Sequence, residues 1–113
     1  AKVGADAGTL AKRAATGVLA TNRLEDVIAA RPDVVLHMPR ITLPYERQNA
    51  DVCALLAAGI DVVSTAGFHH PACHGAAYAA PLLDACRRGG ATLTGTGLNP
   101  GFVAERLATL LTG

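Results

Sequence analysis

The chain has 113 residues, half of them hydrophobic but few aromatic, and a formal net charge of +1. This is the length of one small domain, and the composition is typical of helices packed closely on a sheet. There is no basic run that would indicate nucleic-acid binding, and no apolar stretch approaches the ~20 residues of a membrane span. The three cysteines (Cys53, Cys73, Cys86) are too few and too widely spaced for a disulfide framework, which favours a cytoplasmic location.

Four segments are predicted to be strands. The first is a short run at 17–21. The run 33–38 lies between two prolines and is largely apolar, as is typical of a strand buried on both faces. Two further runs, 60–64 and 91–95, follow it. We expect these strands to be parallel because helical segments separate them.

The first two helices have recognisable ends in the sequence. One is predicted from Leu24, where Asn22 and Glu25 have the spacing of a capping box. The other is predicted over 47–58, with its apolar residues on one face. It ends before Gly59, at a position that commonly takes a left-handed conformation.

The later helices are marked by proline and glycine. The stretch 71–88 predicts a short turn, a break, and a helix that starts at Pro81, because proline is unfavourable inside a helix. Two glycines, Gly89 and Gly90, close it. The last helix is predicted to begin with Asn99 as N-cap and Pro100 at the first helical position. Its apolar stripe consists of Val103, Leu107, Leu110 and Leu111.

The alternation predicts one α/β domain with a doubly wound parallel sheet and right-handed crossovers. In such a sheet the turns after Met38, Ser64 and Gly95 open onto the same edge, where ligands bind. Two interpretations remain open for these turns: a nucleotide or small-ligand site, or ordinary strand–helix connections that use the same small residues for conformational reasons.

Three other motifs carry less information. The run 95–101 is not a dinucleotide fingerprint, since Pro100 occupies the third glycine position and too few residues follow for a ribose-binding acid. No second cluster completes a metal site with the histidines of 69–74, so we expect no metal, and His69 and His70 line the crevice or lie on the surface. His37, inside an apolar strand, is interpreted as a satisfied strand-end histidine.

Four segments in order resemble the dihydrodipicolinate reductase family and its amino-acid dehydrogenase relatives, including 2,4-diaminopentanoate dehydrogenase. They are Gly4-Ala-Asp-Ala-Gly-Thr-Leu-Ala11, Asp33-Val-Val-Leu-His-Met-Pro39, Ser64-Thr-Ala-Gly-Phe68 and Asn99-Pro-Gly-Phe102. The chain departs from the reductase pattern at His37 to Arg40 and at Ser64 and Ala66, which favours a relative with another substrate.

The resemblance implies an oxidoreductase that uses NAD or NADP and transfers hydride to or from a C=N group of a small-molecule substrate. It implies no catalytic residue. The implied cofactor-binding residues are Met38, Pro39, Ser64, Thr65, Ala66, Gly67, Phe68, Asn99, Pro100 and Gly101. Of these, the turn at 64–68 would lie beside the nicotinamide.

The resemblance also implies that residues 1–113 are the later part of a Rossmann-like NAD(P)-binding domain. The first strand, the glycine-rich loop, the first helix, the second strand and the substrate domain would be absent. We therefore expect weak or absent dinucleotide binding and no activity from the chain alone, and a homo-oligomer for the full-length protein. The alternative is a non-catalytic α/β module that binds a ligand or partner through an exposed sheet edge.

Overall fold

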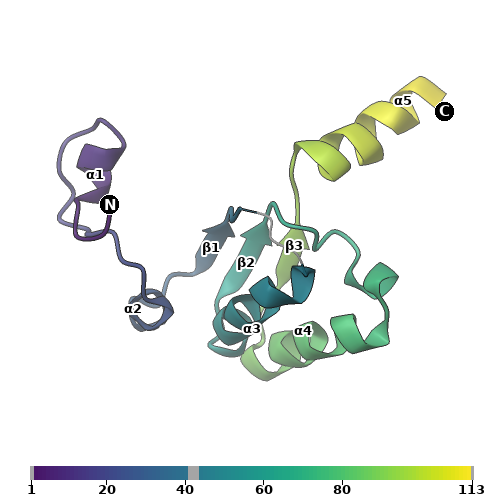
Figure 1. Cartoon of the computed structure of the whole chain (residues 1–113), viewed down its shortest axis with the longest axis horizontal. Coiled ribbons are helices and arrows are strands. Elements are labelled where there is room, and N and C mark those ends of the chain that lie inside the picture. The colour runs from purple at the N-terminus through teal and green to yellow at the C-terminus, as the bar shows by residue number, and fades with distance from the viewer. Residues whose placement is uncertain (1, 41–43, 113) are drawn as a thin grey trace. The chain divides into compact units, whose positions relative to one another are not determined.

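The computed structural model describes residues 2–40 and 44–112, and it divides the chain into two compact units, Ala1–Arg31 and Pro32–Gly113 (Figure 1). No helix in the described ranges is long and apolar enough to cross a membrane.

The unit Ala1–Arg31 contains two short helices, α1 (Ala7–Leu10) and α2 (Leu24–Ala29). The Asp6 carboxylate organises the loop around α1. It accepts hydrogen bonds from the amides of Thr9 (3.0 Å) and Gly17 (2.7 Å), and from Thr16 at 3.1 Å. These bonds, with that of Thr9 first, hold the pKa of Asp6 below its ordinary value, because they favour the charged form.

Two predictions for this unit are wrong. Residues 17–21 form no strand. They contribute one isolated antiparallel bridge, between Leu19 and Asp6. Leu19 itself is 62 % exposed, so no hydrophobic packing supports a longer strand there. The N-cap of α2 is Arg23, not Asn22, and no side chain caps it. The hydroxyl of Thr21 instead accepts a hydrogen bond from the Arg23 amide and donates one to Asp26.

The unit Pro32–Gly113 is built on a parallel sheet of β1 (Val34–His37), β2 (Asp61–Ser64) and β3 (Leu93–Gly95). The strand order is β1-β2-β3, which confirms the parallel α/β arrangement. The 3-10 turn η1 (Tyr45–Gln48) and helix α3 (Asn49–Ala57) connect β1 to β2. The turn η2 (Pro71–His74) and helix α4 (Ala76–Gly89) connect β2 to β3.

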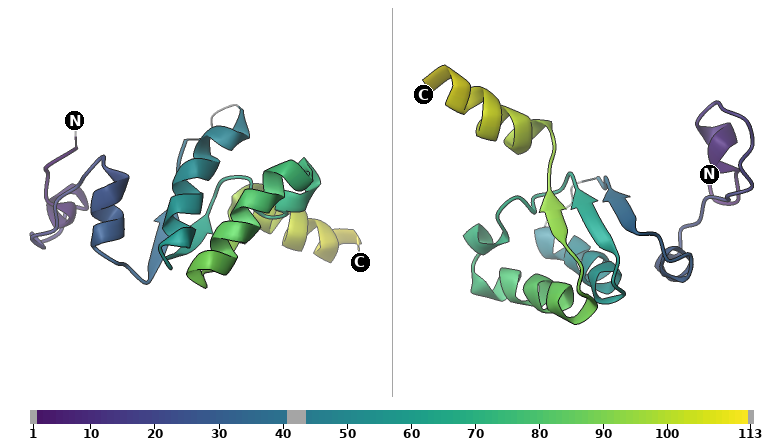
Figure 2. Two further views of the ribbon diagram at one scale, coloured as in Figure 1. Left: turned by 90° about the horizontal axis from the view of Figure 1, so that it is seen from below. Right: turned by 180° about the vertical axis from the view of Figure 1, so that it is seen from behind.

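Within this unit α3 and α4 pack side by side on the same face of the sheet (Figure 2). The core lies between them and the sheet, and it includes Val52, Leu55, Leu56, Val62, Leu82 and Ala85. The opposite face is open, since Val34 and Leu36 of β1 are exposed, Leu36 to 64 %. Burial of β1 on both faces is therefore a wrong prediction. In a strand alternate side chains point to opposite faces, and this unit supplies helices to one face of β1.

Helix α4 starts earlier than predicted. It runs through Pro81 rather than beginning there. The proline ring lies on the exposed side, while Tyr78, Leu82 and Ala85 fill the core, so tertiary packing outweighs the hydrogen bond that proline cannot donate.

The predicted glycine stops are confirmed: Gly59 (φ 82°) follows α3 and Gly90 (φ 65°) follows α4 in left-handed conformations.

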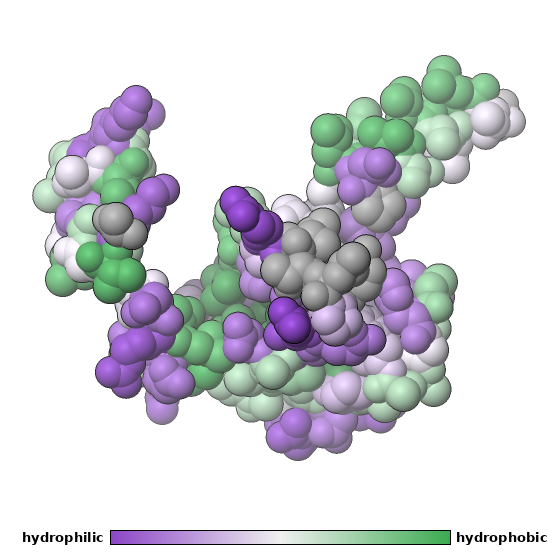
Figure 3. Space-filling view, in the orientation of Figure 1, coloured by the Kyte–Doolittle hydropathy of each residue, from purple (hydrophilic) through white to green (hydrophobic). Residues whose placement is uncertain are grey.

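The last helical segment comprises η3 (Leu98–Leu107) and α5 (Ala108–Thr112). The N-cap of η3, which is a π-helical segment, is Gly97 and not the predicted Asn99, and no side chain caps it. Asn99 lies within η3 at a kink, with non-helical backbone angles (φ −144°, ψ 122°). The predicted apolar stripe is present but uncovered, with Leu110 79 % exposed, and Figure 3 shows hydrophobic residues along this helix. Among the residues that the structure describes, none covers this apolar stripe of the last helix.

Candidate functional site

The carboxyl ends of the three strands lie next to one another, as predicted. The register pairs His37 with Ser64, and Ser64 with Gly95, at the last position of each strand. Two hydrogen bonds continue the pairing into the turns. The Thr65 amide donates to the His37 carbonyl (3.0 Å), and the Thr96 amide donates to the Ser64 carbonyl (2.8 Å). The turns after β1, β2 and β3 therefore form one continuous edge.

Two amides of the turn after β2 form hydrogen bonds within the turn. The Ala66 amide donates to the Ser64 hydroxyl (3.1 Å), and the Phe68 amide donates to the Ala66 carbonyl (2.6 Å). The Gly67 amide has no hydrogen-bond partner in the described part of the chain. A Cβ atom built on Gly67 would meet no heavy atom within 4 Å. Gly67 is thus the point of the turn at which a ligand can approach the backbone.

The side chains of Ser64 and His37 form a hydrogen-bonded pair next to this turn. Ser64 is fully buried, and its Oγ lies 2.9 Å from Nδ1 of the part-buried His37. Burial lowers the pKa of His37 because it disfavours the imidazolium, and the negative charge of Asp51 on α3 opposes that effect. The ring of Phe68 lies near the imidazole, with 6.3 Å between ring centroids.

A second histidine joins the turn to the last helical segment. Gly95 has no room for a side chain because the backbone of Phe68 and His69 crosses directly over it. The His69 ring in turn lies over Gly101, where an added Cβ would be 3.1 Å from Nε2. Both ring nitrogens of His69 are buried without a hydrogen-bond partner among the described residues. Close packing of the Phe68 and His69 backbone therefore requires glycine at position 95, whereas a side chain at position 101 would need the His69 ring to shift by a few tenths of an ångström.

The predicted cofactor-binding residues fall into two groups. Met38, Thr65 and Asn99 are exposed at the strand ends, and Pro39 and Gly67 are partly exposed there. In contrast, Ser64, Ala66 and Phe68 turn their side chains into the interior, and Gly101 is buried beneath His69. For the remaining predicted residue, Pro100, the side chain lies outside the part of the chain that the structure describes. In this structure the buried group shapes the turn, and the exposed group faces the space beyond the strands.

Sequence reasoning placed His37 at a strand end and His69 in the crevice or on the surface, but it predicted neither the contact of His37 with Ser64 nor that of His69 with Gly101. The signal that points to His37 is its place as the last residue of β1, because the parallel register sets it beside Ser64. For His69 the signal is tertiary, since its contact with Gly101 joins segments more than thirty residues apart in sequence.

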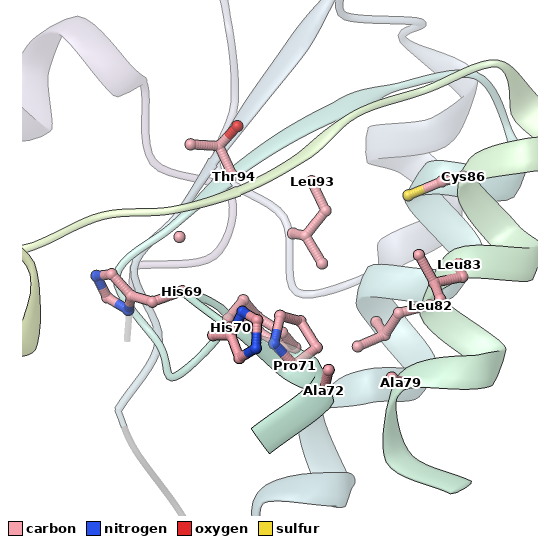
Figure 4. Close-up of a pocket in the computed structure, with 12 residues that line it drawn as sticks. His69, His70, Pro71, Ala72, Ala79, Leu82, Leu83, Cys86, Leu93 and Thr94 are labelled. Atoms are coloured by element: carbon pink, nitrogen blue, oxygen red, sulfur yellow. The ribbon is translucent and has the colours of Figure 1, made fainter. Parts of the chain in front are cut away.

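Two cavities flank β3. One, of about 390 Å³, lies between β3, α4 and the segment 68–72, and its lining is mostly apolar (Figure 4). The other, of about 280 Å³, lies at the end of β3 and has a more polar lining. It is lined by Gly95, Thr96, Gly97, Gly101, Phe102, Glu105 and Arg106. Nowhere in the described ranges do three or more His, Cys, Asp or Glu residues gather as they would around a metal ion.

Comparison with known proteins gives one informative similarity. The chain is 35 % identical over 118 aligned positions to an amine dehydrogenase of Streptomyces virginiae, an alignment that covers 100 % of this chain and 32 % of that relative. The chain thus spans about a third of the relative's length. No family model matches the chain, and no solved structure matches it. The similarity extends over the whole chain and so includes all three strand-end turns.

Proposed function

We propose that this chain belongs to an NAD(P)-dependent oxidoreductase and provides the nicotinamide side of its cofactor site, for hydride transfer to or from a C=N substrate. The observation that carries the proposal is the open backbone at Gly67, at the centre of the strand-end edge. The similarity of the chain to an amine dehydrogenase supports the same class of reaction.

The residues present suit the nicotinamide end of such a cofactor. A flat ring with a carboxamide needs close access to the backbone and neutral hydrogen-bond donors, and Gly67 offers a free amide at a point where no heavy atom lies within 4 Å of an added Cβ. The buried Ser64, Ala66 and Phe68 hold the turn in this shape. The chemistry that the cofactor supplies when bound is hydride transfer, while the protein provides binding and orientation.

The proposal is tested by titrating the ¹⁵N-labelled chain with nicotinamide mononucleotide and following backbone amide shifts. We expect the largest shifts at Thr65 and Gly67, with smaller ones at Thr96. Adenosine monophosphate is the matched control ligand, since it has a ribose and phosphate but no nicotinamide. It should leave the Gly67 amide unshifted.

A variant separates binding at Gly67 from a general effect on the fold. Gly67→Ala adds a methyl group in open space at a residue whose φ is outside the left-handed region, so the fold should tolerate it. We expect this variant to weaken nicotinamide mononucleotide binding, and Ala58→Ser, exposed at the far end of α3, to leave it unchanged. Equal binding by Gly67→Ala and the parent chain would contradict the proposal.

A further inference from the structure

The hydrogen bonds around Ser64 determine which nitrogen of His37 carries the proton. Oγ of Ser64 already accepts the Ala66 amide, and the residue is fully buried. Its hydroxyl hydrogen needs an acceptor, since a buried donor without one is costly. Among described residues the acceptor within reach is Nδ1 of His37, at 2.9 Å. Nδ1 must then be unprotonated, which places the proton of the neutral ring on Nε2.

The other nitrogen of this ring is available to a ligand. Nε2 of His37 has no hydrogen-bond partner in the described ranges, and it is not among the buried unpartnered nitrogens, unlike both nitrogens of His69. His37 ends β1 at the same edge as the turn that carries Gly67. The edge therefore presents two uncharged donors, the His37 Nε2–H and the Gly67 amide.

We propose that Ser64 fixes His37 in the Nε2–H form and that this N–H donates a hydrogen bond to a carbonyl oxygen of the bound ligand. Uncharged donors suit an uncharged acceptor, and a neutral imidazole can donate to a carbonyl without introducing a positive charge. The carboxamide oxygen of nicotinamide is an acceptor of this kind, and this step rests on the function proposed above. The titratable group that faces the ring from the adjoining helix is Asp51.

The first test is the tautomer itself, measured without ligand by ¹⁵N chemical shifts of the histidine rings at neutral pH. We expect Nδ1 of His37 in the unprotonated range and Nε2 in the protonated range. Ser64→Ala should replace this single form by a mixture, while exposed His70 gives an internal reference in both spectra. An Nδ1–H form in the parent chain would overturn the proposal whether or not the variant folds.

The second test adds nicotinamide mononucleotide, with ribose 5-phosphate as the control that lacks the carbonyl. We expect the first ligand to shift His37 Nε2 and the control to leave it unchanged. His37→Phe should weaken binding about three- to tenfold, as for the loss of one hydrogen bond, and His37→Gln should restore part of it.

The remaining outcomes separate this proposal from the proposed function. If the nucleotide shifts Gly67 but not His37, the donor role of His37 is overturned and the nicotinamide site stands. If it shifts neither, the nicotinamide site is overturned, and the donor role with it.

Discussion

At the scale of single residues, Ser64 joins two strands and a turn through one hydroxyl group. Its Oγ contacts Nδ1 of His37 on β1 and the Ala66 amide, and it is enclosed on all sides. In a low-dielectric interior such a fully bonded group specifies one arrangement of its neighbours. The shape of the turn that presents Gly67 therefore depends on a residue that a ligand cannot touch.

The lowered pKa of His37 gives a pH dependence of stability. In the folded chain its pKa lies below the ordinary value of 6.5, so between the folded and unfolded values the unfolded state binds more protons. The contribution of His37 to the free energy of unfolding is complete above pH 6.5. That free energy falls as the pH drops from 6.5 through the folded-state pKa. We expect His37→Gln to reduce this fall, measured by urea unfolding at pH 7.5 and 5.5.

The comparison between parent and variant removes the effect of the other histidines, which both chains share. Asp6 contributes little above pH 5.5, since its ordinary pKa of 3.8 is shifted downward in the folded chain. An identical loss of stability in both chains on acidification would show that His37 is not the group that titrates.

At the scale of elements, α4 shows how packing overrides a local preference. Pro81 lies in the second turn of a helix that nevertheless starts at Ala76. The helix keeps its early start because Tyr78 and Ala79, which precede the proline, are buried. Much of a helix's stability in a protein comes from such a buried face rather than from intrinsic propensity.

Replacing Pro81 by alanine should therefore stabilise the chain. Alanine restores the amide hydrogen bond within a helix that is already formed, and it is favoured over proline by about 3 kcal/mol in a helix interior. The greater freedom of the unfolded alanine variant offsets about 0.4–1 kcal/mol of this. We expect a net gain of about 1–3 kcal/mol in the free energy of unfolding, measured by urea denaturation.

The neighbouring Ala80→Gly is the matched control, since Ala80 is also exposed in α4. It should destabilise the chain by about 0.5–1 kcal/mol. If Ala80→Gly had no effect and Pro81→Ala gave no gain, α4 would begin at Pro81, as its sequence predicts.

At the scale of the whole molecule, the chain consists of two units that differ in how they are held together. In Pro32–Gly113 a hydrophobic core joins the sheet to α3 and α4. In Ala1–Arg31 the described side chains are mostly exposed, and the Asp6 carboxylate with its backbone amides provides much of the order. Segments with few buried apolar contacts open locally at low free-energy cost.

Asp6→Ala should accordingly loosen the first unit alone. We expect faster hydrogen exchange at the amides of Thr9 and Gly17, which lose their acceptor, and unchanged exchange at Val62 in β2. Asp84→Ala, which removes an exposed ion pair with Arg88, is the control and should change neither. Slower or unchanged exchange at Thr9 would contradict the role given to Asp6.

The sequence by itself determined the parallel α/β class, the three strands of the sheet, the glycine stops after α3 and α4, and the turn 64–68 as a candidate ligand-binding segment. These follow from local patterns, because apolar periodicity and the conformational freedom of glycine act within a few residues. Tertiary structure decided the rest. It set which face of β1 is covered, carried α4 through Pro81, and brought His37 to Ser64 and His69 to Gly101. Those outcomes depend on contacts between distant segments, and the short-range pattern of a sequence does not record such contacts.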